Sequence, residues 1–157
     1  MLNKRVYDIN IAIERLKNYC ALQDKCQWDV IQKMHEWSLL EVSQNHILEI
    51  LIQEQYVDEE RYSRSFCRGK FRIKKWGKIK IRNELKKKYI SEVCITKGLQ
   101  EISDSEYQKG LDTQYHKQKD ATKEKNYFVK KKKIATYLIS KGYESNLVWN
   151  KIRGLKE

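Results

Sequence analysis

The chain has 157 residues, of which 40% are hydrophobic and 34% charged, and its formal net charge at pH 7 is +12. Four Trp and ten Tyr argue against a disordered polyelectrolyte, because such rings bury much apolar area when a chain folds. The length fits one ordinary domain or a short array of small ones. With no proline and only six glycines, few residues interrupt helices, and the composition predicts an all-α protein.

Apolar residues recur at helical spacing along the chain, separated by polar breaks and capping signals. Ser38 and Glu41 have the spacing of a capping box, Asp58 is placed to cap a helix, and Gly142 is a candidate C-terminal glycine. We expect the polar helix near residues 103–119 to be poorly packed. The expected helices cover about residues 6–22, 28–37, 38–52, 58–75, 78–89, 91–102, 103–119, 125–140 and 145–155.

Apolar positions also recur about every fifty residues. Val30, Ile81 and Ile134 are separated by 51 and 53 residues. This period predicts three tandem three-helix repeats, covering residues 1–56, 57–103 and 104–157, that form an elongated, curved array. One compact helical bundle is the alternative. The same offsets relate three further sets of residues: Met34, Leu85 and Leu138; Leu48, Leu99 and Ile152; and Leu51, Ile102 and Leu155.

Motifs for catalysis, cofactors and membranes are missing from the sequence. The glycines stand alone rather than in a phosphate-binding loop, no HExxH or GxSxG motif occurs, and the paired carboxylates lie at predicted helix starts. Cys20, Cys26, Cys67 and Cys94 form no CxxC pair, which indicates reduced thiols rather than a metal site. No segment approaches about 20 apolar residues, and no signal peptide is apparent. We therefore expect a cytoplasmic, monomeric, non-enzymatic protein without cofactor, metal, membrane or small-molecule substrate.

Cationic residues are densest in the middle repeat. Between Arg61 and Lys88 the chain has thirteen Lys or Arg and one acid, Glu84. Apolar residues keep helical spacing through this segment, which predicts two amphipathic helices rather than a disordered tail. We expect each helix to bury one face and leave a basic face. The residues expected to face inward are Tyr62, Phe66 and Ile73 in the first helix, and Ile81, Leu85 and Tyr89 in the second.

Rows of cations at helical spacing can follow a phosphate backbone without reading bases, or can meet an acidic protein groove. For any single lysine, a solvated helix face is the simpler explanation. The third repeat has a second cluster, in the helix equivalent to residues 78–89. The candidate partner- or nucleic-acid-binding residues are Arg64, Arg68, Arg72, Lys75, Lys78, Lys80, Arg82, Lys86, Lys87, Lys130, Lys131, Lys132 and Lys133.

The middle repeat resembles the central signature of the RecX family, in which a Gly-Leu-hydrophobic-Asp-Asp-Glu-Arg-Phe-Ala segment leads into a basic helix, a Gly and an Ile-xx-Glu-Leu helix. The resemblance follows helix order over about residues 5–155 and is most specific between 56 and 90. The motifs that carry it are Tyr56-Val57-Asp58-Glu59-Glu60-Arg61-Tyr62-Ser63, Ser65-Phe66, Lys70, Trp76-Gly77-Lys78, Ile81, Glu84-Leu85 and Lys88.

This resemblance implies three tandem three-helix repeats and a non-enzymatic modulator of the RecA recombinase. Family members bind along the groove of the RecA–DNA filament and lower its ATPase and strand-exchange activities. The chain departs from the family pattern in two places. Residues 24–30 replace an Arg-rich run, so contacts of that run are not carried over, and the usual Gly before the hydrophobic-Asp pair is Gln55 or Tyr56.

The sequence therefore predicts negative modulation of RecA in DNA repair and recombination, through binding to the RecA filament on single-stranded DNA. Contact of the basic face with naked DNA is a possible addition. The main alternative is a basic, helix-turn-helix-like protein that acts directly on duplex DNA. A third interpretation is a basic helical scaffold for another acidic partner.

Overall fold

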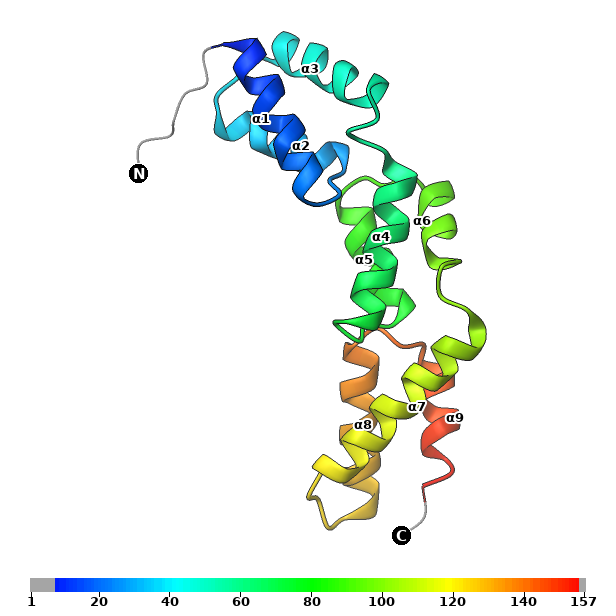
Figure 1. The fold of residues 1–157 in the computed structure, drawn as a ribbon. Coiled ribbons are helices and arrows are strands. Elements are labelled where there is room, and N and C mark those ends of the chain that lie inside the picture. Colours follow the sequence, from blue (N-terminus) through cyan, green and yellow to red (C-terminus); the bar gives the residue numbers. More distant parts are fainter. Residues whose placement is uncertain (1–7, 156–157) are drawn as a thin grey trace.

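The computed structural model describes residues 8–155, and within that range all regular secondary structure is helical. Three successive groups of three helices form an elongated array that bends after the first group (Figure 1). The predicted all-α fold of three tandem three-helix repeats is confirmed. Residues 6 and 7 of the first expected helix lie outside the described residues. The helices are α1 (Ile9–Leu22), α2 (Gln27–Glu36), α3 (Glu41–Gln53), α4 (Glu59–Arg72), α5 (Lys78–Lys87), α6 (Glu92–Leu99), α7 (Asp104–Ala121), α8 (Tyr127–Ser140) and α9 (Ser145–Ile152).

The second helix of every repeat ends in the same way. Just past α2, α5 and α8, the residues Ser38, Tyr89 and Gly142 take left-handed backbone with φ of 55°, 60° and 100°. The next N–H in each case donates back to a helical carbonyl at 3.2–3.3 Å, which is a Schellman motif. The donor and acceptor pairs are Leu39 and Met34, Ile90 and Leu85, and Tyr143 and Leu138. The three acceptors are one of the sets predicted from the fifty-residue period.

Several local expectations were wrong at helix ends. Ser38 belongs to the end of α2 and does not cap α3, whose N-cap is Leu40. Ile73 follows the end of α4 and is 76% exposed, and Tyr89, in its left-handed position, is 84% exposed. Neither residue faces inward, because the helix that would have turned it toward the core has already ended.

Helix α7 is better packed than its polar composition indicates. Tyr107, Leu111, Gln114 and Tyr115 lie one helical turn apart or less and are buried. Ser103 caps this helix by accepting a hydrogen bond from the Glu106 N–H at 3.2 Å. The expectation of poor packing was therefore wrong, since large aromatic side chains supply the buried face.

The buried side chains form two separate clusters. One is made mostly by the first repeat, includes Leu16, Met34 and Leu51, and is joined by Val57. The other is continuous through the second and third repeats, includes Leu85 and Leu138, and is joined by Cys26 of the first repeat. The last two repeats therefore share one core, whereas most buried residues of the first repeat form another.

The junction between the second and third repeats is made by backbone in direct contact. The Gly77 N–H donates to the Lys141 carbonyl at 2.7 Å, and the Ile79 N–H donates to the Gly142 carbonyl at 3.0 Å. A Cβ atom added to Gly77 would lie 2.3 Å from the carbonyl carbon of Gly142, so no side chain fits there. This contact holds the start of α5 against the end of α8.

The junction between the first and second repeats is partly polar. Lys88 donates at 2.9 Å both to Asp29, from the first repeat, and to the hydroxyl of Tyr62. Burial disfavours the Lys88 charge, but these two hydrogen bonds outweigh it and raise the pKa of Lys88. Arg61 pairs with Asp24 at 3.2 Å in the same region. Charged side chains thus add to the apolar contact that Cys26 and Trp28 of the first repeat make with the core of the second.

Candidate anion-binding interface

Helix α4 carries the start of the basic segment and divides it between two surfaces. Asp58 caps the helix by accepting from the Arg61 N–H at 2.9 Å, and two further acids lie in the first turn, where the helix dipole favours them. Tyr62, Cys67 and Phe71 are buried. The cations that remain lie either toward α6 and α7 or toward the first repeat.

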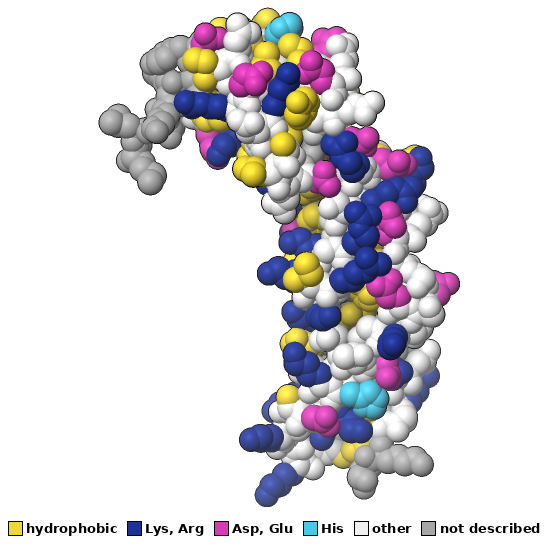
Figure 2. Space-filling view, in the orientation of Figure 1, with side chains coloured by type: hydrophobic (Ala, Val, Ile, Leu, Met, Phe, Trp, Pro, Cys, Tyr) yellow, Lys and Arg dark blue, Asp and Glu magenta, His cyan; other side chains and the backbone are white. Residues whose placement is uncertain are grey.

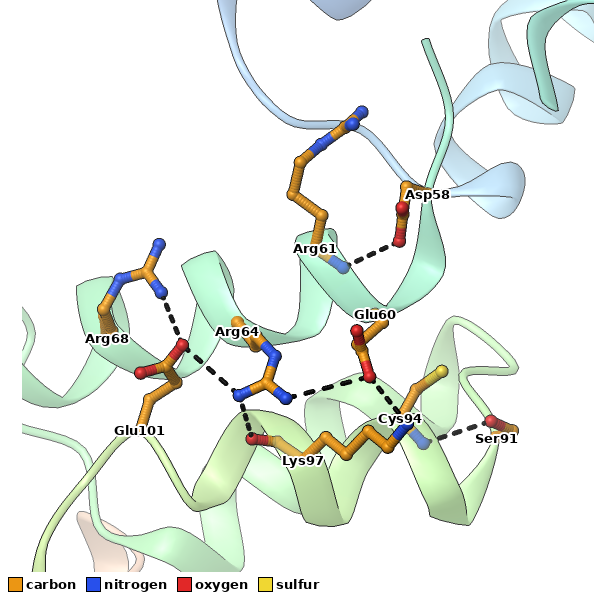
Figure 3. Close-up of polar contacts among 9 residues, drawn as sticks. All are labelled: Asp58, Glu60, Arg61, Arg64, Arg68, Ser91, Cys94, Lys97 and Glu101. Atoms are coloured by element: carbon orange, nitrogen blue, oxygen red, sulfur yellow. Dashed lines mark hydrogen bonds and ion pairs between the residues drawn. The ribbon is translucent and has the colours of Figure 1, made fainter. Parts of the chain in front are cut away.

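Three arginines of α4, which are Arg64, Arg68 and Arg72, are paired with acids from α7 or the segment before it. Figure 3 shows the pairs of Arg64 and Arg68. Glu101 accepts from Arg68 at 2.9 Å and from Arg64 at 3.5 Å. Arg72 pairs with Glu106 at 2.8 Å, and its hydrogen bond lowers the pKa of that carboxyl. These three candidates therefore connect helices of the chain itself, and each charge is partly neutralised.

A second acid extends the same network at the other end of α4. Glu60 lies 2.8 Å from the amine of Lys97 and 3.7 Å from the guanidinium of Arg64. The Lys97 hydrogen bond is the main cause of a lowered pKa at Glu60. Arg64 also donates to the backbone carbonyl of Lys97 at 3.3 Å. We name this set the arginine ladder and define it as Glu60, Arg64, Arg68, Arg72, Lys97, Glu101 and Glu106.

Three candidates on α5 are paired as well. Arg82 and Lys86 lie 2.6 Å and 3.3 Å from the carboxylate of Glu92, at the start of α6. The Lys86 hydrogen bond is the largest cause of a lowered pKa at Glu92. Lys87 pairs with Glu84 on its own helix at 2.9 Å.

The candidates between α4 and the start of α5 have other partners. The Lys75 amine donates to the Arg72 carbonyl at 2.7 Å. Lys78 lies 4.6 Å from the ring centre of Tyr107, and Lys80 lies 4.6 Å from that of Trp76. A ring attracts an ammonium group without neutralising it, so Lys78 and Lys80 keep their charge.

In the third repeat, the lysine cluster lies along α8. Lys133 pairs with Glu124 at 3.2 Å, and Lys131 lies 4.3 Å from the ring centre of Tyr127. Among residues 8–155, no carboxylate lies within 4.0 Å of the amines of Lys130 or Lys132. This cluster therefore stays a separate candidate surface, on a different repeat from the arginine ladder.

Figure 2 shows Lys and Arg side chains gathered over the middle repeat, with acidic side chains set among those near α6. The space-filling view agrees with the ion pairs of the arginine ladder. The thirteen candidates therefore do not form one uniform face, and those with acidic partners are distinct from those without.

A second basic surface lies on the side of α4 that faces the first repeat, and sequence reasoning included only Lys80 from it. Here aromatic rings and lysines alternate, with amine-to-ring-centre distances of 4.6–5.5 Å and one ring-to-ring contact of 5.7 Å. The spacing of Phe66 and Lys70, and of Trp76 and Lys80, is four residues, which is the signal that could have revealed it. We name this set the ring–lysine row; in spatial order it is Trp28, Lys88, Tyr62, Phe66, Lys70, Trp76 and Lys80.

A groove of about 360 Å³ lies beside this row. Its walls come from the loop between α1 and α2 and from α4, so it spans the first and second repeats. Tyr62, Phe66, Lys70 and Lys88 of the ring–lysine row line it. Its other lining residues are Gln23, Asp24, Lys25, Asp29, Ser65, Gly69, Ile73 and Lys74.

Residues 8–155 contain neither a candidate metal site nor a candidate membrane span. Within that range no group of three or more His, Cys, Asp or Glu side chains is placed to hold a metal ion. None of the helices α1 to α9 combines the length and the apolar character needed to cross a bilayer.

Comparison with known proteins finds similarity to RecX proteins. The model of the second three-helix domain of RecX matches residues 58–99, which contain α4, α5 and α6. Regulatory protein RecX of Bacillus cytotoxicus is 22% identical over 140 residues, covering 89% of this chain and 52% of the relative. Regulatory protein RecX of Halalkalibacterium halodurans is 27% identical over 103 residues, covering 66% of this chain and 39% of the relative. The chain thus spans about half or less of the length of these relatives.

Solved structures share the fold. The crystal structure of RecX from Lactobacillus salivarius superposes with a TM-score of 0.80 at 21% identity, covering 92% of this chain and 94% of that one. A second crystal structure, of a regulatory protein RecX, gives a TM-score of 0.84 at 22% identity, covering 94% and 73%. With the matched domain on the basic middle repeat and RecX relatives along most of its length, the chain is similar to RecX proteins in sequence and shares their fold.

Proposed function

We propose that this protein binds the RecA filament on single-stranded DNA and lowers its ATPase and strand-exchange activities, acting as a regulator rather than an enzyme. The observation that carries the proposal is the position of the RecX domain match. Residues 58–99 contain all thirteen of the cations from Arg61 to Lys88. The part of the chain that matches the RecX domain is also the part best suited to a polyanionic partner.

The shape of the molecule supports the same proposal. Three repeats in a line present a long surface, and a filament offers a long groove (Figure 1). Basic residues on the second and third repeats could then contact one filament at several points. We propose that the protein works as a cytoplasmic monomer, and that the thirteen candidate cations contribute to this contact, those without acidic partners most directly.

The test is the ATPase rate of RecA on single-stranded DNA as this protein is titrated in. We expect the rate to fall to a low plateau at low salt, and to recover as salt screens the contact. A variant with Lys78, Lys130 and Lys132 changed to Gln should need more protein for the same effect, because these three cations have no acidic partner in the described part of the chain. A control with Lys117, Lys119 and Lys123 changed to Gln has the same net charge and should match the parent. An unchanged rate with the parent protein at every concentration would refute the proposal.

A further inference from the structure

We infer that the groove between the first and second repeats binds the phosphodiester backbone of single-stranded nucleic acid directly, through the ring–lysine row. This inference deepens the proposed function and rests on it, because a RecA filament encloses a single strand. It adds a contact that the chain makes with the strand itself, at a surface distinct from the arginine ladder.

Lys88 is paired with Asp29, but the other two lysines of the row, Lys70 and Lys80, are held against rings and have no acidic partner in the described part of the chain. Trp76 lies between Lys70, at 4.9 Å, and Lys80, at 4.6 Å, and Lys70 also lies 5.3 Å from the ring centre of Phe66. No carboxylate among residues 8–155 lies within 4.0 Å of either amine. The arginine ladder, by contrast, is matched by Glu60, Glu101 and Glu106. A fully charged lysine that is already held in place loses less side-chain freedom when it binds a phosphate.

The acids in the groove do not cancel this charge. Asp24 is paired with Arg61 at 3.2 Å, and Asp29 accepts from Lys88 at 2.9 Å. Both are thus engaged in the junction between the repeats. Lys25 and Lys74 also line the groove, and neither has a carboxylate within 4.0 Å in the described part of the chain. The groove is therefore left with a net positive charge.

Gly69 leaves the wall of the groove open. It lies inside α4, where glycine weakens a helix. Its φ is not in the left-handed region, so its backbone conformation does not require glycine. A Cβ atom at this position would meet nothing within 4 Å, so packing inside the chain does not require glycine either. Only a ligand that approaches the helix closely would benefit from the missing side chain.

The chemistry of the groove favours a single nucleic-acid strand. Proteins that bind single strands combine a positive groove for the backbone with aromatic side chains against which bases lie. The ring–lysine row supplies both kinds of side chain along one line, beside the groove of about 360 Å³. The bases of a duplex are paired and stacked inside it, so the rings of the row favour a single strand.

The experiment measures binding of a fluorescently labelled oligo(dT) to the full-length protein by anisotropy, without RecA, from 50 to 200 mM salt. Lys70→Gln combined with Lys80→Gln should weaken binding about tenfold at 50 mM salt. It should also make the salt dependence shallower by about 1.4 in log–log slope, since each phosphate contact on a single strand contributes about 0.7. Lys117→Gln combined with Lys123→Gln removes the same charge from the third repeat and should leave both quantities near the parent values.

A second variant separates binding from folding. Gly69→Gln introduces a better helix former into open space, so the protein should be at least as stable as the parent in urea. Its side chain would nevertheless obstruct the groove, and we expect oligo(dT) binding to fall at least fivefold.

The inference fails if the parent does not bind oligo(dT) at 50 mM salt, or if the two lysine pairs weaken binding equally. It also fails if Gly69→Gln binds as the parent does, or if a duplex or poly-glutamate binds as tightly as oligo(dT). None of these results requires RecA, so the proposed function is judged separately. Suppression of filament ATPase by a parent that does not bind oligo(dT) would refute only the groove, whereas the reverse result would refute only the proposed function.

Discussion

Gly77→Ala, which adds a single methyl group, should lower the free energy of unfolding by more than the removal of one buried methyl group usually does. The Cβ of Gly77→Ala would lie 2.3–2.4 Å from three backbone atoms of Gly142 and Tyr143, which cannot move aside as a side chain can. The φ of Gly77 is −78°, so alanine itself is not strained there and the whole effect comes from the contact.

The expected loss of stability follows from the contacts that weaken when the backbones at Gly77 and Gly142 move apart. Overpacking of a close contact costs about 1–3 kcal/mol. Moving the two backbones apart also weakens the hydrogen bonds from Gly77 to Lys141 and from Ile79 to Gly142, at about 0.5–1.5 kcal/mol each. We therefore expect the free energy of unfolding to fall by about 2–5 kcal/mol, measured by urea denaturation followed by far-UV circular dichroism.

Gly69→Ala is the matched control, because it is the same chemical change on the same repeat. Its new methyl group would meet nothing within 4 Å inside a helix, so this variant should gain about 0.5–1 kcal/mol. A fall in the free energy of unfolding for Gly77→Ala and a rise for Gly69→Ala would support the backbone contact between the second and third repeats. If Gly77→Ala were as stable as Gly69→Ala, the backbone contact between the second and third repeats would be wrong.

Two further predictions concern single side chains. Leu85→Ala removes a fully buried side chain from the shared core and should cost about 2–5 kcal/mol; an unchanged urea midpoint would contradict its burial. The carboxyl of Glu59 is buried where the first two repeats meet, and burial raises its pKa to about 7 from the usual 4.5. The unfolded chain releases this proton first, so the free energy of unfolding should fall by roughly 2 kcal/mol as pH rises from about 4.5 to 7, and then level off. In Glu59→Gln that slope should be absent, and an identical pH profile for parent and variant would refute it.

The repeat architecture could be predicted from the sequence because it depends on apolar spacing. Met34, Leu85 and Leu138 occupy equivalent places at the ends of α2, α5 and α8, as their offsets indicate. Helix ends were harder to predict, since several non-glycine residues take left-handed backbone. Gln55, with φ of 63°, stands just past the end of α3 in a conformation that glycine favours.

The candidate interface could be predicted only in part. Helical spacing identified the basic residues, but their acidic partners come from distant parts of the chain. Arg68 and Glu101 are 33 residues apart, and Lys88 and Asp29 are 59 apart. No helical period relates such residues, so the sequence could not separate neutralised cations from free ones.

The division of the buried side chains into two clusters has a consequence for every stability measurement on this protein. Each cluster can melt as its own cooperative unit, so denaturation need not follow a single two-state transition. Amide protons of α1–α3 would then exchange through an opening that leaves α4–α9 folded. A probe in the first repeat and a probe at Leu85 would report different free energies, and one melting temperature would describe neither unit.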